Sequence, residues 1–331
     1  MNILKYRFSL TCLCVLLSLM LLLQSCSHEP GVWRNDEIQN GLRKDLHKLN
    51  DELLTALKAG DPKQMDEMLS AELLESGQLY REAHLLSLRM KNDTYKLLAD
   101  FYIVHEKRGL NQVDGNIDGN KFTLSYDALM QDMYIAMFVP QKAVEKMMIT
   151  AVYYKYNYGW KLFLLNEGRY TENNQTAPQL LKRALSQYNK HQLVDAVLTT
   201  NMAHDCLRPN EMWHYPIDDH THATLGKAIS EANQAYKFPF TLTQAPTHPR
   251  IIHISNKITS EGTFPVIYYL STVKVSDTTA LKRENEMIQQ VIGQAIPGID
   301  QDKKYVYYTA YNEMPNYHKA VDSFEMIERV K

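Results

Sequence analysis

Hydrophobic residues in the first part of the chain follow a helical pattern. Between residues 38 and 57 they recur every three or four positions, which predicts one amphipathic helix. Gly60 is expected to end this helix, and the polar spacing over residues 61–64 resembles a capping box, so a second helix is expected to begin there. A third helical stretch is expected over residues 79–90.

After Lys96 the pattern changes to that of β-strands. Aromatic and β-branched residues dominate the segments that we expect to form strands, which cover residues 97–104, 121–126, 133–139, 147–156 and 160–166. The last two strands are joined by Asn157, Tyr158 and Gly159, a short Gly-containing connection that predicts a hairpin. The Asn-, Asp- and Gly-rich segment 111–120 is expected to be a loop between strands.

A polar stretch interrupts these patterns at residues 171–178 and ends in Pro178. It predicts a domain break between Arg169 and Leu180. Helical periodicity then returns and predicts a hairpin of two helices that turns at residues 189–191, followed by a third helix.

The remaining residues alternate between strand and helix patterns. Their order is strand, strand, helix, strand, strand, and Asp277 and Thr278 are expected to open the helix. The sequence as a whole therefore predicts an α+β fold, with helices packed on a curved, cone-like antiparallel sheet. A helical hairpin and a second small antiparallel α+β unit are expected to follow.

The first α+β part resembles a known superfamily. Helices precede a long meander of strands that ends in the run Val152–Leu162, and this arrangement is similar to the nuclear-transport-factor-2-like, cystatin-like cone fold. The Gly159-Trp160-Lys161-Leu162 hairpin resembles one seen in envelope members of that superfamily. The resemblance implies a cone-shaped sheet with a concave side. It fixes no function, because the superfamily includes enzymes, ligand carriers and scaffolds.

Composition and charge exclude several classes of protein. The chain has 331 residues, of which 45% are hydrophobic and 22% are charged, as in a globular protein of about two domains. The formal net charge is −2, so the basic excess of a nucleic-acid-binding protein is lacking and no nucleic-acid partner is expected.

The N-terminus carries the clearest functional signal. Lys5 and Arg7 precede an apolar run over residues 8–23, which is shorter than the roughly 20 residues of a membrane span. The order of basic, apolar and then small residues is typical of an export signal. Its last four residues, Leu23-Gln24-Ser25-Cys26, resemble the lipobox of bacterial lipoproteins. The resemblance implies cleavage before Cys26 and lipidation of Cys26.

Lipidation would place the protein in the cell envelope. Each buried methylene of an acyl chain contributes about 0.8 kcal/mol to membrane binding, so the lipid on Cys26 would anchor the chain. Ser27, rather than Asp, follows the cysteine, which in the lipoproteins that it resembles favours the outer membrane of a Gram-negative bacterium. The leaflet that the protein faces stays open.

These patterns divide the chain into five expected segments. They are a lipoprotein signal peptide (1–25), a tether (26–35), a nuclear-transport-factor-2-like α+β domain (36–170), a helical hairpin segment (178–240) and a C-terminal α+β domain (248–331).

The densest polar cluster lies between His204 and His222 and is a candidate metal site. Imidazole, thiolate and carboxylate groups are ligands that zinc prefers, and the candidate ligands are His204, His214, His220 and His222. Their spacing matches no established zinc motif, and the neighbouring acidic residues Asp218 and Asp219 also suit a turn and a helix cap. The cluster is therefore either a solvated loop between helices or a zinc site. Cys206 is expected to be a buried core residue rather than a nucleophile.

Aromatic residues crowd the hairpin at residues 153–160. Strands favour such residues for core packing, but rings on the concave side of a cone could also line a ligand pocket. The candidates for that pocket are Tyr154, Tyr156 and Trp160. If the cone forms, Trp160 is expected to pack against the helices.

The sequence contains neither a nucleophile-elbow motif nor a phosphate-binding loop. We therefore predict no catalytic residue and no cofactor. The expected function is that of a non-enzymatic binding or scaffold module, held at the membrane by its N-terminal lipid and partnered by another envelope protein. The alternatives are a metal-dependent or pocket-based enzyme, using the cluster from His204 to His222 or the cone interior, and a carrier of a small hydrophobic or glycan ligand.

Overall fold

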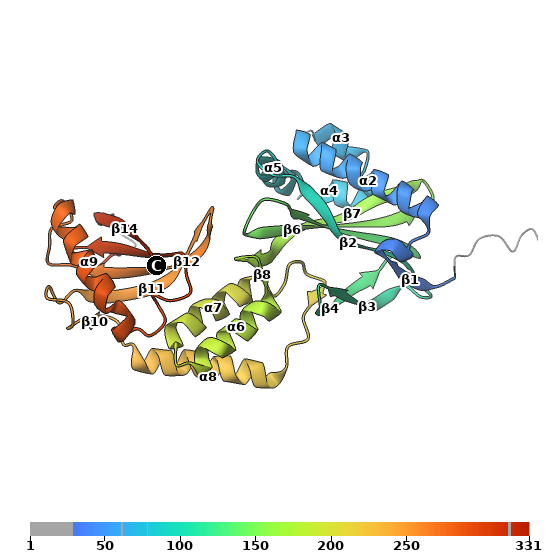
Figure 1. Ribbon diagram of the computed structural model, residues 1–331. Coiled ribbons are helices and arrows are strands. Elements are labelled where there is room, and N and C mark those ends of the chain that lie inside the picture. Colours follow the sequence, from blue (N-terminus) through green and yellow to red (C-terminus); the bar gives the residue numbers. More distant parts are fainter. Residues whose placement is uncertain (1–28, 61, 78, 317–318, 331) are drawn as a thin grey trace, which may run out of the picture.

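A strongly curved antiparallel sheet forms the centre of the first half of the protein (Figure 1). The fold is seen in a computed structural model that describes residues 29–60, 62–77, 79–316 and 319–330. The strands of this sheet are, in spatial order, β1 (Gly31–Arg34), β2 (Tyr95–Val104), β5 (Asp132–Pro140), β6 (Lys146–Tyr156), β7 (Gly159–Glu172) and β8 (Gln175–Thr176). The predicted α+β class, with helices on a curved antiparallel sheet, is confirmed.

Helices cover one face of this sheet. They are α2 (Asn40–Ala59), α3 (Pro62–Asp66), α4 (Ala71–Ser76) and α5 (Leu79–Met90), and the short helix η1 (Asn35–Glu37) precedes them. The apolar stripe of α2, which includes Leu46, Leu53 and Leu57, packs with Tyr134 and Tyr153 of the sheet in one core. Gly60 ends α2 in the left-handed conformation with φ 65°, as the sequence predicts.

A smaller sheet covers the opposite face. It consists of β3 (Gly109–Ile117), β4 (Asn120–Ala128) and β9 (Trp213–His214). β5 therefore lies between two layers, and every residue of its central segment, Met133–Val139, is buried. Burial on both faces explains why this strand reads as an unbroken apolar run rather than an alternating one.

The expected loop at residues 111–120 is wrong, because most of it forms β3. β3 pairs with β4 from Gly109↔Ala128 to Ile117↔Asn120, and only Asp118 and Gly119 form the turn. Both turn residues have positive φ, as a two-residue hairpin turn requires. The strand is hard to recognise from sequence because only Val113 and Ile117 of it are buried and much of the rest is Asn, Asp and Gly.

The expected tether is also partly wrong. Its last residues form β1, which pairs with β2 from Gly31↔Val104 to Arg34↔Phe101. Trp33 adds a ring contact with Tyr102 at a centroid distance of 5.5 Å. The chain is therefore fixed to the sheet from Gly31 onward. The predicted signal peptide and Cys26 lie outside the described residues.

The polar stretch at residues 171–178, where a domain break is predicted, forms the end of β7, a short hairpin and the start of α6. β7 runs to Glu172 and turns through Asn173 and Asn174 into β8. Thr176 then caps helix α6 reciprocally with Gln179. The polar side chains of residues 171–178 therefore serve a tight turn and a helix cap, and the domain break between Arg169 and Leu180 stays a prediction.

Three helices connect the two halves: α6 (Ala177–Asn189), α7 (Leu193–Asp205) and α8 (Asp219–Ala235). The chain between α7 and α8 returns to the first half, where Trp213 pairs with Leu124. Asn210 donates a hydrogen bond to Thr150 Oγ1 at 3.0 Å, and both side chains are buried. The predicted helical segment therefore contributes a strand and core residues to the first half.

The C-terminal sheet has the order β10-β11-β12-β13-β14. Its elements are β10 (Phe240–Thr241), β11 (Arg250–Thr259), β12 (Gly262–Leu270), α9 (Thr278–Ala295), β13 (Tyr305–Tyr311) and β14 (Ser323–Arg329). Asp277 caps α9 by accepting from Ala280 N–H, as predicted.

The antiparallel arrangement predicted for this unit is wrong at one pairing, because β12 and β13 are parallel. α9 lies between these two strands in the sequence, and such a helical connection lets the chain re-enter the sheet in the same direction.

Candidate functional site

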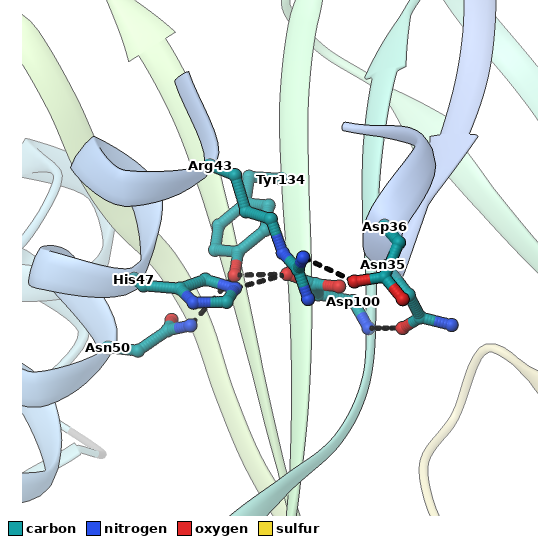
Figure 2. Close-up of polar contacts among 7 residues, drawn as sticks. All are labelled: Asn35, Asp36, Arg43, His47, Asn50, Asp100 and Tyr134. Atoms are coloured by element: carbon teal, nitrogen blue, oxygen red, sulfur yellow. Dashed lines mark hydrogen bonds and ion pairs between the residues drawn. The ribbon is translucent and has the colours of Figure 1, made fainter. Parts of the chain in front are cut away.

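Figure 2 shows a polar network beneath α2 that the sequence analysis did not identify. Asp100 on β2 is completely buried. Its Oδ2 atom accepts a hydrogen bond from the Tyr134 hydroxyl at 3.0 Å and lies 2.9 Å from His47 Nε2. The Asn50 side-chain amide donates to the Tyr134 hydroxyl at 2.7 Å. A polar residue on the apolar stripe of α2 and an Asp within an apolar strand were the available sequence signals.

The network fastens the N-terminal segment to the sheet. Asp100 N–H donates to Asn35 Oδ1 at 3.0 Å, and Arg43 of α2 forms an ion pair with Asp36 (Figure 2). His47 is 35% exposed at its side chain, whereas Asp100 has no exposure. Neither residue lines any of five cavities found along the described residues. We therefore interpret the network as structural.

The predicted metal ligands do not form a site. His204, His214, His220 and His222 are all exposed. Within the described residues, no three His, Cys, Asp or Glu side chains are arranged to hold a metal ion. Asp218 instead caps α8, accepting from Thr221 N–H at 2.8 Å. The zinc interpretation of this cluster is therefore wrong, and its acidic start serves the cap and turn that the sequence also allowed.

Cys206 is buried and unbonded, as predicted. Burial raises the pKa of its thiol, with the nearby Glu172 acting in the same direction, so the reactive thiolate form is disfavoured. The Arg169 guanidinium lies 3.8 Å from Glu172 and 3.5 Å from Glu145. Burial also raises the pKa of both carboxyl groups, and the guanidinium of Arg169 offsets part of that rise.

The three residues predicted to line a ligand pocket, Tyr154, Tyr156 and Trp160, make separate contacts. Tyr154 is buried in the core between the two sheets and donates its hydroxyl to Asp127 O at 3.0 Å. Trp160 packs at the edge of the other core, beneath the helices, as predicted. The Tyr156 hydroxyl donates to Glu72 at 3.2 Å. These contacts are those of packed and hydrogen-bonded side chains, and the ligand pocket on this hairpin stays a prediction.

An aromatic cavity lies instead on the C-terminal sheet. It has a volume of about 490 Å³, and its walls are formed by Ile252, His253, Tyr268, Tyr311, Met314, Pro315 and Asn316. Three of its rings lie nearly parallel in a row across β11, β12 and β13. The ring of Tyr268 is 5.7 Å from that of His253 and 6.5 Å from that of Tyr311, with interplanar angles of 29° and 25°. The volume is within the usual range for a small-molecule site.

A β-bulge produces this arrangement. The register of β11 against β12 shifts between Ile251 and His253. Ile251 and Ile254 both point into the buried core, so the two residues between them, Ile252 and His253, lie on the other face. Regular alternation would have put only one of them there. Bulges redirect side chains in this way and are common next to binding sites.

Hydrogen bonds hold the rim of the aromatic cavity in place. The Asn312 side chain donates to Ser271 O at 3.1 Å and to Val273 O at 2.6 Å, and it accepts from Val275 N–H at 2.8 Å. These contacts join the segment after β12 to the segment after β13. Burial raises the pKa of the Tyr311 hydroxyl, so this ring stays neutral. The cavity therefore offers aromatic surface on a supported frame, with few charged groups.

No protein-family model matches the chain, and neither a curated protein nor a solved structure is significantly similar to it. Its function is therefore inferred from its own fold and surfaces. Among the described residues, no helix is long and apolar enough to cross a membrane.

Proposed function

We propose that this protein is a non-enzymatic binding module of the cell envelope, anchored by a lipid on Cys26. The observation that supports binding is the aromatic cavity on the C-terminal sheet. The observation that supports the anchor is the lipobox-like sequence, with its serine after the cysteine, which favours the outer membrane of a Gram-negative bacterium. On this proposal the first half is a cone-fold scaffold of the nuclear-transport-factor-2-like type, and the C-terminal unit carries the ligand site.

The ligand that best suits the cavity is a ring with an apolar face. The row of His253, Tyr268 and Tyr311 presents aromatic surface, and aromatic groups contribute strongly to binding when they are buried by a partner. Asn316 adds a polar group at the wall, which could orient a hydroxyl-bearing ligand. A sugar ring of an envelope glycan combines an apolar face with peripheral hydroxyls, so we propose a glycan as the ligand.

We predict that Tyr268→Ala weakens glycan binding at least tenfold, a loss of about 1.4 kcal/mol. The ring lies in the centre of the aromatic row, so its removal leaves His253 and Tyr311 without their common neighbour. Binding to an array of bacterial envelope glycans would identify a ligand, and calorimetry with that ligand would give the change in affinity.

Tyr158→Ala is the matched control for this prediction. Its ring is 58% exposed and lies on the hairpin for which the sequence predicted a ligand pocket. It should leave glycan binding unchanged. Equal losses in the two variants, or no binding by the unmodified protein to any glycan, would refute the glycan site.

The lipid anchor predicts that Cys26→Ala moves the protein from the membrane fraction to the soluble fraction. The physical reason is the loss of the acyl chains, because the described residues contain no membrane-spanning helix. Fractionation of bacterial cells in high salt and carbonate measures the change. Cys206→Ala is the control, since this buried thiol is not part of the anchor. A Cys26→Ala protein that stays with the membranes would contradict the anchor.

A further inference from the structure

β14 is the outer strand of the C-terminal sheet and has one unpaired edge. On one side it pairs with β13 from Tyr305↔Arg329 to Tyr311↔Ser323. On its other side, no strand of the described chain pairs with it. A groove of about 1040 Å³ follows the strand over residues 324–330 and is bounded on its far side by α9. An open edge of this length is a template for a further strand.

The hydrogen bonds of β14 show which main-chain groups face the groove. Val330 N–H donates to Lys304 O at 3.2 Å, so the main-chain groups of Val330 point toward β13. These groups alternate in direction along an antiparallel strand. Those of Glu325, Ile327 and Arg329 must therefore point to the open edge.

The side chains of the same three residues lie on the sheet face away from α9. Met326 is buried and Phe324 and Val330 pack in the C-terminal core beneath α9. Ile327, on the opposite face, is 58% exposed, although it is a large apolar residue. Glu325 and Arg329 are exposed on either side of it. The edge therefore presents an apolar residue between an acid and a base.

This order is self-complementary. If a second β14 runs antiparallel with Ile327 opposite Ile327, each Glu325 lies opposite an Arg329 of the other strand. If one β14 strand is shifted by two residues along the other, Ile327 lies opposite a charged side chain. If it is shifted by four residues in one direction, Glu325 lies opposite Glu325. Opposite charges across a strand pair are stabilising and like charges are destabilising. One register is therefore favoured over its neighbours.

We propose that β14 binds β14 of a second copy of this chain, which makes one continuous sheet with Ile327 at the two-fold axis. In this register the residues whose main-chain groups face the open edge lie directly opposite one another as hydrogen-bonded pairs. Each such pair exchanges two main-chain hydrogen bonds. Glu325, which already pairs with Lys257 in its own chain, gains a second cation from Arg329 of the other copy. The interface is isologous, so it closes as a dimer and leaves no free β14 edge.

The groove contains a second unpaired feature. Asn285 of α9 is 3% exposed and lines it, and its side-chain Nδ2 has no hydrogen-bond partner among the described residues. Gln289 occupies the other end of that amide by donating to Oδ1 at 2.8 Å. A buried donor without a partner is unfavourable by about 1–3 kcal/mol.

The test is disulfide cross-linking of the full chain in bacterial membranes. In a hydrogen-bonded pair of an antiparallel sheet the two Cα atoms are about 5.5 Å apart, a distance that a disulfide can span. Ile327→Cys should therefore give an oxidant-dependent band at twice the monomer mass on a non-reducing gel. Leu110→Cys, at a site 92% exposed on β3, is the matched control and should stay monomeric.

A second variant tests the register. Arg329→Glu places an acid opposite Glu325 and should weaken dimerisation of the detergent-solubilised chain at least tenfold in sedimentation, with an unchanged far-ultraviolet circular dichroism spectrum. Cross-linking of Ile327→Cys to a different protein would overturn the proposal in favour of strand addition by another partner. Absence of a cross-link, or equal cross-linking of Leu110→Cys, would also overturn it, as would a dimer that Arg329→Glu leaves unaffected.

Discussion

Replacing Trp213 with Ala should lower the free energy of unfolding by about 3–5 kcal/mol, the usual range for removing a large aromatic side chain from a core. Trp213 is completely buried between the two sheets of the first half. Its ring stacks on Phe122 at 3.6 Å and contacts Tyr170 and Tyr215 edge-on. The residue also holds β9 against β4, so its loss should release the segment between α7 and α8 from the first half.

Urea denaturation followed by circular dichroism would measure this loss, because the signal does not depend on the tryptophan removed. Trp160→Ala is the matched control. Trp160 lies at the rim of the core beneath the helices and is only partly buried, so its replacement should be less destabilising. Equal effects of the two substitutions would contradict the assignment of Trp213 as the main aromatic anchor.

Lys303→Met should also destabilise the protein by about 3–5 kcal/mol, because it leaves a buried carboxylate without its counter-charge. Lys303 Nζ donates to Asp195 Oδ2 at 2.7 Å and to Gln301 O at 2.8 Å. The side chains of Lys303 and Asp195 are 7% and 4% exposed. The pair joins α7 to the C-terminal unit, so its loss should affect the contact between them.

The pH dependence gives this prediction a second readout. Burial raises the pKa of Asp195, while Lys303 and Arg183 act in the opposite direction. A carboxyl group whose pKa is raised on folding binds its proton more tightly in the folded state. Its contribution to stability therefore falls as the pH rises from about 4 through the folded pKa. Without Lys303 that pKa should rise further, so Lys303→Met should be less destabilised at pH 5 than at pH 8.

Urea denaturation at pH 5 and pH 8 would measure both the loss of stability in Lys303→Met and its dependence on pH. Lys304→Met is the control. Lys304 is the next residue and pairs with Glu261, but both side chains are about half exposed. Its removal should therefore change stability by less than about 1 kcal/mol. A Lys303→Met protein that is no less stable than Lys304→Met would refute the buried-pair argument.

Local patterns in the sequence were sufficient for the elements that depend on neighbouring residues. The apolar stripe of α2, its end at Gly60 and the cap of α9 at Asp277 are all as predicted. Each rests on a spacing of a few residues, because helix faces and caps are formed within one segment. The same holds for Trp160, whose position in the hairpin was enough to direct it toward the helices.

Strands with little apolar character were missed for a related reason. In β3 only Val113 and Ile117 are buried, and the Asn-, Asp- and Gly-rich composition indicated a loop. β3 exists because β4 pairs with it and the larger sheet covers its buried face. Strand formation of this kind depends on tertiary neighbours more than on intrinsic preference.

The sequence by itself determined the α+β class, most helices and the central strands, and it carries the only signal for the proposed lipid anchor. Tertiary structure decided which distant residues meet. It placed Trp213 against Phe122, brought His47 to Asp100, and used a bulge at Ile252 to build an aromatic cavity far from the hairpin where one was expected. The physical reason is that hydrophobic periodicity fixes the buried face of a segment, whereas its partner is selected by strand pairing and packing over the whole chain.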